Sequence, residues 1–281
     1  MNYRHAYHAG NPADVLKHLT LIALLERLLV KDTALHYLDT HAGRGRYRLD
    51  SQESLASGEA DQGIAKLRAA RLTVPLLDEY FRLIDNERAF FGPSAYPGSP
   101  AIAAQLLRSI DRMTFAELER SEAQLLKSEF GDDPRVTIKS VDGYGLLKAD
   151  LPPKERRGLV LIDSPFERQA EEFKVILAAL AEAHARFAHG VFAIWYPIKI
   201  RSEVDGFVRS ARSRFARPAL RIDLTLYPAT TANRLNGSGM LIFNPPFELE
   251  RRLEPALGAC AKILSAQSLK LEHLAVAIPV R

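Results

Sequence analysis

Short apolar runs alternate with helical patterns along most of this chain, and that alternation most constrains its fold. Runs typical of strands lie at seven places, 34–38, 112–117, 135–140, 158–162, 190–196, 219–226 and 238–243. Helical patterns lie between most of them, notably at 99–110, 121–130, 169–188 and 248–264. Such alternation is typical of a mostly parallel sheet with helices on both faces. The sequence therefore predicts an α/β fold with a seven-stranded, mostly parallel sheet, and a weaker final strand at 272–279.

One interval, residues 50–96, breaks the alternation. It carries no strand signal, only helix-favouring sequence such as LLDEYFRLIDNERAFF, and it runs into the turn-rich segment YPGSP at 96–100. A structureless connection of this length is rare in a compact domain. We therefore expect residues 50–96 to form a small helical insertion within a domain built from residues 1–49 and 97–281.

Polar residues follow the first four predicted strands at the points where these end. They are Asp39, His41 and Gly43 after the first strand, Glu117 at the end of the second, Asp142 and Gly143 after the third, and Asp163 after the fourth. Open α/β folds bind ligands at this edge of the sheet. A carboxylate such as Glu117 can accept hydrogen bonds from both hydroxyls of a ribose, and Gly143 permits close approach of a ring. Each acid alone could be a helix cap, but four such ends together favour a nucleoside-type cofactor.

The tetrapeptide Asp-Ser-Pro-Phe at 163–166 suits chemistry on a nucleobase amine. The lone pair of such an amine is delocalised into the ring, so methyl transfer requires its two N–H groups to be held in place. The Asp163 carboxylate and the main-chain carbonyl of Ser164 can each accept one of them, Pro165 stiffens the turn, and Phe166 can stack on the base. With the glycine loop, this predicts a methyltransferase; the alternative for the tetrapeptide alone is a strand-ending turn.

A second tetrapeptide, Asn-Pro-Pro-Phe at 244–247, competes for the same role. It follows the seventh predicted strand, whereas the amine acceptors should lie on the strand next to the first, where the strand order reverses. We therefore interpret Asn244 as part of a strand-to-helix turn, with Asp163 as the preferred candidate.

Charge distribution indicates more about partners than the net charge of +4. Between Lys199 and Arg221, seven basic residues accompany two acidic ones, which is typical of a phosphate-binding surface or of a solvated helix face. Arg44, Arg46 and Arg48 alternate just after the glycine loop. Because arginine forks suit phosphate, we expect these guanidinium groups beside the ligand site.

The cysteine, the histidines and the apolar stretches of the sequence bear on metal binding and on the cellular compartment. Cys260 is the only cysteine, so a disulfide framework and a cysteine-rich zinc site are excluded. The histidines near the amino terminus lack a zinc-binding spacing, and no metal site is predicted. No apolar stretch approaches the roughly 18 residues that span a bilayer, and the opening MNYRHAYHAGN is too polar for a signal peptide, so we expect a cytoplasmic protein.

Several motifs together resemble one bacterial family. They are YRHAYHAGNPADVLKH at 3–18, LDTHAGRGRY at 38–47, YPGSP at 96–100, AEL at 116–118, DG at 142–143 and FNPPF at 243–247. Over nearly the whole chain they resemble the J family of adenine-N6 methyltransferases of large-subunit ribosomal RNA, relatives of which are also labelled as proteins for using external DNA. The resemblance implies a Rossmann-like class I methyltransferase fold, S-adenosyl-L-methionine as the donor, and protein-free ribosomal RNA as the partner. We favour a monomer without membrane association.

The same resemblance assigns roles to individual residues. It implies a catalytic Asp163 and a substrate contact at Tyr3, with cofactor contacts at His18, His41, Ser99, Glu117, Asp142 and Gly143. The chain departs from the family where Asp-Pro-Pro-Tyr is usual, because it has Ser164 and Phe166. The main-chain acceptor survives this change, but the turn loses stiffness and a tyrosine hydroxyl, so rate or base preference could differ. A guanine-N2 enzyme, a DNA-adenine enzyme and a nucleic-acid-binding protein without catalysis stay open as alternatives.

Overall fold

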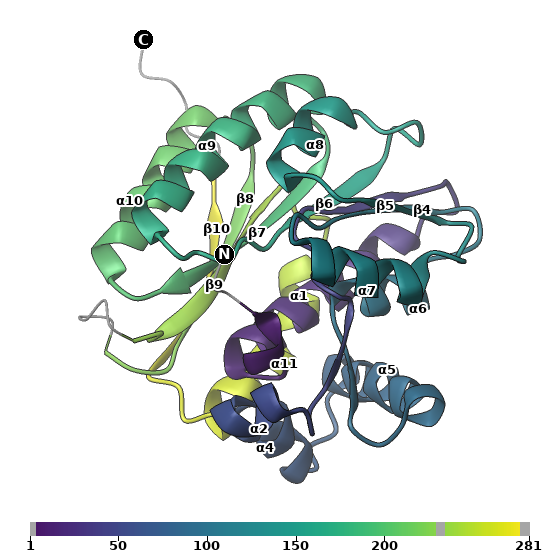
Figure 1. Ribbon diagram of the computed structural model, residues 1–281. Helices are drawn as coiled ribbons and strands as arrows, with labels where there is room; N and C mark the ends of the chain where they lie inside the picture. Colours follow the sequence, from purple (N-terminus) through teal and green to yellow (C-terminus); the bar gives the residue numbers. More distant parts are fainter. Residues whose placement is uncertain (1–3, 229–233, 276–281) are drawn as a thin grey trace.

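A computed structural model describes residues 4–228 and 234–275. Its centre is a sheet of eight strands, β1 (His36–Asp39), β4 (Arg112–Ala116), β5 (Val136–Lys139), β6 (Gly158–Ile162), β7 (Val191–Ile198), β8 (Ala219–Thr225), β9 (Gly237–Phe243) and β10 (Ser268–Leu274). Their order is β10-β8-β9-β7-β6-β1-β4-β5 (Figure 1). Neighbours from β7 to β5 pair in parallel, whereas β9 and β10 are antiparallel to their neighbours. The predicted fold class is therefore confirmed, with eight strands instead of seven.

The final strand lies earlier than its predicted position. The sequence pattern placed it at 272–279, part of which falls outside the described residues, whereas β10 spans Ser268–Leu274 and pairs with β8 at the sheet edge. Its residues are mostly exposed or half-buried. Residues 275–280 are more apolar than residues 268–274, so the sequence pattern favours a strand nearer the carboxyl terminus.

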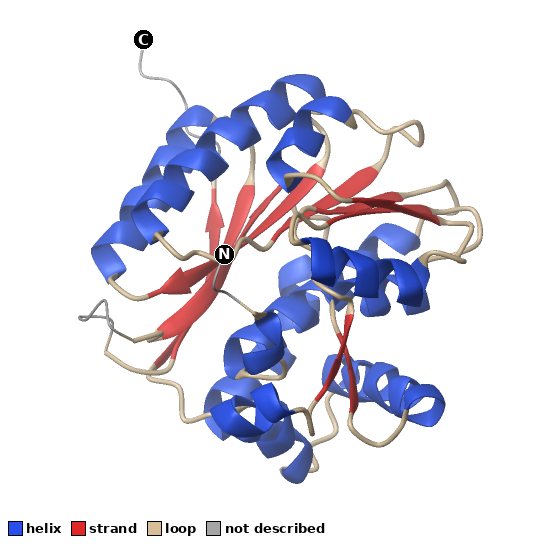
Figure 2. Cartoon of the chain, viewed as in Figure 1, coloured by secondary structure: helices blue, strands red, loops and turns tan. Residues whose placement is uncertain are grey.

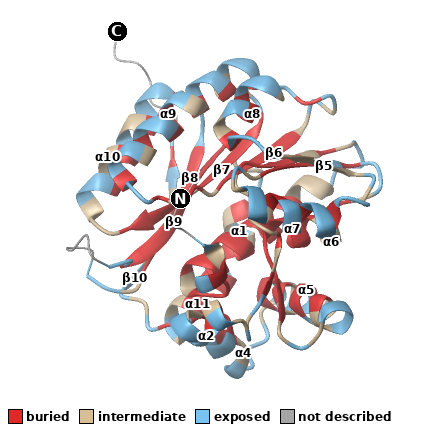
Figure 3. Ribbon diagram, in the orientation of Figure 1, coloured by how far each residue is buried: buried red, intermediate tan, exposed pale blue. Residues whose placement is uncertain are grey.

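Helices cover both faces of the sheet (Figures 1 and 2). One layer contains α8 (Gly143–Ala149), α9 (Gln169–Arg186) and α10 (Arg201–Arg214), and the other contains α1 (Pro12–Leu29), α6 (Ser99–Leu106), α7 (Arg120–Phe130) and α11 (Leu249–Ile263). Because side chains alternate along a strand, Tyr37 packs into the α1 layer while its neighbour Leu38 packs into the α9 layer. Figure 3 shows the buried strands between the two layers.

Helix α1 is unusual because every residue from Ala13 to Leu25 is buried. Its start is fixed by Asn11, whose side chain accepts a hydrogen bond from the Asp14 amide at 2.8 Å. Burial extends to the polar side chains of Asp14, Lys17 and His18. Buried polar groups need partners, so these three are expected to bind one another or neighbouring elements.

Between β1 and α6, the chain forms short helices and two very short strands. The helices are α2 (Gln52–Ser57), α3 (Glu59–Gln62), α4 (Ile64–Ala69) and α5 (Pro75–Phe91). Strand β2 (Arg46–Arg48) precedes these helices, strand β3 (Ala95–Pro97) follows them, and the two strands pair antiparallel. The prediction that residues 50–96 contain no strand was therefore wrong at the end of this interval, where β3 begins. A three-residue strand is too short to give a periodic pattern. Helix α5 shares the α1 core, and the division into residues 50–96 against the remainder stays a prediction. Within the described ranges, no helix has the length and apolar character needed to cross a bilayer.

Candidate active site

The strand order reverses at β1, which lies between β4 and β6. A cavity of about 250 Å³ opens at the carboxyl ends of these strands. The loops after β1, β4, β5 and β6 bring His41, Glu117, Asp142 and Asp163 to its wall. Residues distant in the sequence thus meet at the edge where open α/β sheets bind ligands, as the strand-end pattern predicts.

Most of the residues predicted to contact a cofactor line this cavity. They are His41, Ser99, Glu117, Asp142 and Gly143. Tyr3 lies outside the described residues, and His18 does not reach the cavity wall. The sequence pattern missed Lys17, Tyr144 and Glu172, which also line it.

Glu117 closes one end of the cavity just after β4. One carboxylate oxygen accepts from the Gly43 amide at 2.9 Å and the other from the Glu119 amide at 2.7 Å. These bonds fix the carboxylate, while burial raises its pKa and the two amides partly offset that rise. Each carboxylate oxygen can accept a further bond, so Glu117 can still receive the hydroxyls of a ribose.

Asp142 and Gly143 form the start of α8. The Asp142 side chain caps the helix by accepting from the Tyr144 amide at 3.2 Å. A Cβ on Gly143 would lie 1.9 Å from the carbonyl oxygen of Thr40, so no larger residue fits. The glycine is therefore required by the close packing of α8 on the loop after β1, which also sets the width of the cavity.

His41 lines the same cavity from the loop after β1. Its Nδ1 is 2.8 Å from the Thr40 hydroxyl, and its ring meets the edge of Tyr144 at 5.1 Å between centroids. Burial lowers its pKa. The imidazole is thus neutral at pH 7 and offers hydrogen bonds and a ring surface to a ligand, without a charge.

His18 is fully buried behind the cavity, which does not fit a direct cofactor contact. Its Nδ1 lies 2.9 Å from the hydroxyl of Tyr80, and its Nε2 lies 3.2 Å from an oxygen of Asp14. Burial lowers its pKa to about 3, so it is neutral at pH 7. The structure gives His18 a place in the polar network that supports Lys17.

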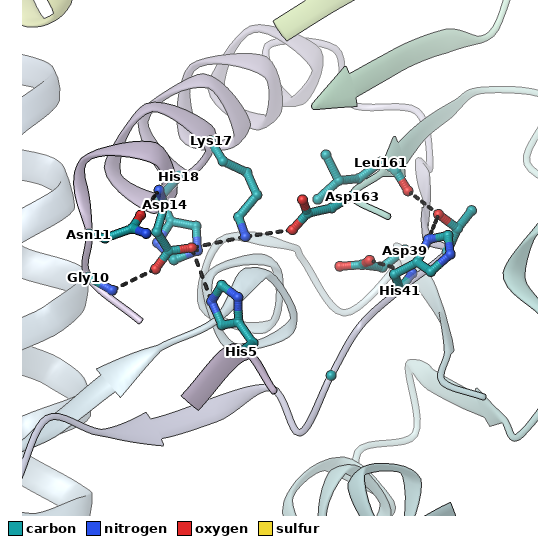
Figure 4. A network of polar contacts seen from close by, with 12 residues as sticks. His5, Gly10, Asn11, Asp14, Lys17, His18, Asp39, His41, Leu161 and Asp163 are labelled. Atoms are coloured by element: carbon teal, nitrogen blue, oxygen red, sulfur yellow. Dashed lines mark hydrogen bonds and ion pairs between the residues drawn. The ribbon is translucent and has the colours of Figure 1, made fainter. Parts of the chain in front are cut away.

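That network crosses the site from α1 to the turn after β6 (Figure 4). The Lys17 ammonium lies 2.9 Å from Asp14 and 2.6 Å from Oδ2 of Asp163. The Lys17 side chain is only 6% exposed, so the ion pairs have little competition from water. Since the pair engages Oδ2, the second oxygen of Asp163 is the one that can accept from a ligand.

A second cavity, of about 580 Å³, lies on the other side of Asp163. Lys17, Asp163 and Pro165 line both cavities, and the second is also lined by aromatic and basic residues that include Trp195 and Lys199. The Asp163 carboxylate therefore stands where two ligands, one in each cavity, would meet.

Two other residues of the tetrapeptide, Ser164 and Phe166, have little exposed surface. Ser164 is 2% exposed, and its hydroxyl donates to a carboxylate oxygen of Glu172. Phe166 is 3% exposed and makes edge contacts with Phe173 and Trp195. Phe166 also lines the second cavity, so its stacking on a base stays a prediction.

The arginines after the glycine loop are paired with acids, and so are two arginines of the 199–221 cluster, contrary to the expectation of free phosphate ligands. After the glycine loop, the pairs are Arg44 with Glu122, Arg46 with Glu87, and Arg48 with Asp50. In the 199–221 cluster, Arg201 and Arg221 both bind Asp223, at 2.6 and 2.8 Å. The charge available to a polyanion is therefore smaller than the sequence pattern suggests.

Asn244 lies at the opposite edge of the sheet from Asp163. Strand β9 is antiparallel to β7, so its carboxyl end sits beside the start of β7. The Asn244 side chain donates to the carbonyls of Ala188 and Gly190, at 3.0 and 2.7 Å. The Asn-Pro-Pro-Phe segment is thus a structural turn, as interpreted from its position.

The first cavity has the chemical features that S-adenosylmethionine needs. Glu117 offers acceptors for a ribose, and Tyr144 and His41 offer ring surfaces for an adenine. Asp142, Asp163 and Glu172 supply negative charge for a sulfonium group. A switch-point cavity of this kind under this strand order defines a class I methyltransferase that uses S-adenosylmethionine.

The comparison with known proteins is more specific. Residues 32–273 match the family described as "Ribosomal RNA large subunit methyltransferase D, RlmJ", and the chain belongs to this family. It is 40% identical over 267 residues to the Haemophilus influenzae protein named "Ribosomal RNA large subunit methyltransferase J", covering 94% of each chain. The protein of the same name from Escherichia coli K12 is 38% identical over 257 residues, covering 92% of this chain and 91% of the relative.

A solved structure agrees with this assignment of the fold. The crystal structure of a Legionella pneumophila protein is 34% identical, with a TM-score of 0.86, over 96% of this chain and 99% of that one. The resemblance drawn from the motifs is thereby confirmed.

Proposed function

We propose that the chain transfers a methyl group from S-adenosylmethionine to the N6 amine of an adenine in large-subunit ribosomal RNA. The position of Asp163 between the two cavities carries this proposal. With the donor in the smaller cavity and an extruded base in the larger one, the exocyclic amine would lie beside the Asp163 carboxylate. The names of the two relatives support ribosomal RNA as the substrate.

Two hydrogen-bond acceptors in the turn after β6 orient the amine for methyl transfer. S-adenosylmethionine supplies a methyl group on a positively charged sulfur. The Asp163 carboxylate and the Ser164 carbonyl each accept one N–H of the amine, which directs the nitrogen lone pair out of the ring plane and toward the methyl carbon. The nitrogen forms the new bond to carbon as the bond to sulfur breaks. The proton then released passes along the hydrogen bond to Asp163 and on to solvent.

Lys17 holds the carboxylate in place for this step. Its ammonium is fixed from behind by Asp14 and binds Oδ2 of Asp163, which orients the carboxylate before substrate arrives. An acceptor that is already oriented needs little reorganisation in the transition state. Lys17 is therefore a positioning residue in this proposal.

The form of the substrate and the state of the protein belong to the same proposal. An adenine buried within an assembled particle could not swing into the second cavity, so we infer that protein-free or early-assembly ribosomal RNA is the substrate. We also propose that the reaction takes place in the cytoplasm. We also propose that the protein acts as a monomer.

The test uses radiolabelled donor, the purified protein and ribosomal RNA stripped of its proteins. After incubation, digestion to nucleosides and mass spectrometry should identify N6-methyladenosine in the large-subunit RNA. N2-methylguanosine would assign the guanine enzyme, and preference for matched DNA in competition would assign a DNA enzyme. Donor binding without transfer to either nucleic acid would contradict the proposal.

A further inference from the structure

Two hydroxyl groups from different elements meet on one carboxylate beside the site. The Tyr144 hydroxyl donates to Oε1 of Glu172 at 2.5 Å, and the Ser164 hydroxyl donates to the same oxygen. Ser164 belongs to the turn after β6, Glu172 to the first turns of α9, and Tyr144 to the start of α8. Helices α8 and α9 lie side by side at this point (Figure 1).

The environment keeps both hydrogen bonds strong. Ser164 is 2% exposed, and Tyr144 and Glu172 are half-buried in the wall of the smaller cavity. Burial and the Glu172 carboxylate both raise the pKa of Tyr144, so its hydroxyl stays protonated and remains a donor. Hydrogen bonds to an ionised acceptor are among the stronger ones in proteins.

Ser164 stands where the family resemblance leads us to expect proline. A proline would stiffen the turn through its ring, because the ring fixes φ. Serine has no such restriction, so the main-chain carbonyl that follows its Cα needs another support. The bond from the Ser164 hydroxyl to Glu172 supplies one, because it fixes the side chain against α9.

We propose that the Ser164 hydroxyl is a positioning group that replaces the rigidity of proline: anchored on Glu172, it holds the Ser164 carbonyl where that carbonyl accepts the target amine. This rests on the proposed function. Because Glu172 also binds Tyr144, whose ring meets His41 in the cavity wall, the same carboxylate connects the acceptor turn to the donor cavity. The specific departure from the family motif is thus compensated within this chain.

The test compares two substitutions that both remove the hydroxyl. In Ser164→Ala the turn has neither anchor nor ring, and we expect kcat on protein-free ribosomal RNA to fall about tenfold. The KM for RNA and the donor Kd, measured by calorimetry, should stay within about twofold, because no ligand contact is lost. In Ser164→Pro the ring restores the rigidity, and kcat should return to within about twofold of the unmodified protein.

Two further variants test the path through Glu172. Glu172→Ala should lower kcat, and the loss in the double variant with Ser164→Ala should be clearly smaller than the sum of the two single losses, because both changes break the same bond. The loss need not be zero, because Ser164→Ala also removes the acceptor of the Phe166 amide. Ser164→Thr retains the hydroxyl and should keep most of the activity, which covers the case in which the proline variant does not fold. Urea unfolding of each variant separates loss of positioning from loss of folding.

The inference is overturned if Ser164→Ala keeps the unmodified kcat, or if its loss adds fully to that of Glu172→Ala. The inference is also overturned if Ser164→Pro and Ser164→Thr both fold but neither keeps the activity. These outcomes differ from failure of the proposed function, in which the unmodified protein itself does not methylate the RNA.

Discussion

Removal of the Lys17 ammonium is the perturbation whose cost can be worked out most directly. In Lys17→Met, Asp14 and Asp163 lose the cation that lies 2.9 and 2.6 Å from them. The Asp14 side chain is 1% exposed and cannot be rehydrated without opening α1. Burial raises the pKa of Asp14, but His18, Lys17 and His5 together hold it well below its ordinary value. Of these groups, Lys17 carries a full positive charge at pH 7, whereas His18 is neutral.

The magnitude follows from the cost of an uncompensated buried charge. Removing one partner of a buried ion pair destabilises a protein by about 3–5 kcal/mol. Asp14 keeps the hydrogen bond from the Gly10 amide at 2.9 Å and its contact with Nε2 of His5 at 3.3 Å, which favours the lower end of that range. With an unfolding entropy of about 2.1 cal/mol/K per residue, a loss of about 3 kcal/mol lowers the Tm of this chain by roughly 5 °C.

The assay is urea unfolding at pH 7, followed by circular dichroism, with Lys66→Met as the control. Lys66 lies exposed on α4, so its replacement should change stability by less than about 0.5 kcal/mol. Adding Asp14→Asn to Lys17→Met should recover part of the loss, because the neutral amide needs no counter-charge. An unchanged midpoint for Lys17→Met, or a double variant less stable than the single one, would refute the reasoning.

Three other predictions concern single residues. Glu117→Gln should weaken donor binding about tenfold by calorimetry, because an amide offers one acceptor atom where the carboxylate offers two; an unchanged Kd would remove Glu117 from the donor site. Burial raises the pKa of Asp39 to about 6, against 3.8 for the free side chain, so its ionised form costs on the order of 3 kcal/mol in the folded protein. That cost appears as pH rises from about 4 to 6, and Asp39→Asn should flatten this part of the curve of unfolding free energy against pH; an identical curve would contradict the assignment. Asn244→Ala should destabilise the protein by about 1–3 kcal/mol, because it leaves two carbonyls without their donor, and should leave donor binding unchanged.

The fold was largely predictable because its strands are apolar runs separated by amphipathic helices. The seven predicted strands match β1 and β4 to β9 within a few residues, whereas β2 and β3 were missed because three residues cannot show a period. The edge strand β10 was misplaced because its exposed residues carry little apolar signal. The polar residues at the strand ends also predicted the position of the cavity, because the carboxyl ends of parallel strands lie at one edge of the sheet.

The rest of the site depends on contacts between residues far apart in the sequence. Arg46 pairs with Glu87, 41 positions away, and Lys17 pairs with Asp163, 146 positions away. A helix pattern distinguishes an apolar face from a polar one, but α1 is buried on every side along most of its length, so the pattern could not show that Lys17 reaches the cavity. The burial of Phe166 was equally hidden, because it depends on packing against α9 and β7.

The central claim is that the turn at Asp163, and not the one at Asn244, accepts the hydrogen bonds of the target amine. Its most direct test measures methyl transfer to protein-free ribosomal RNA in a single turnover, with saturating donor, for Asp163→Ala and Asn244→Ala side by side. We expect Asp163→Ala to bind the donor with a Kd within about threefold of the unmodified protein and to transfer methyl at least about a hundredfold more slowly, while Asn244→Ala transfers at the unmodified rate. Unchanged transfer by Asp163→Ala, or loss of transfer only in Asn244→Ala, would contradict the account.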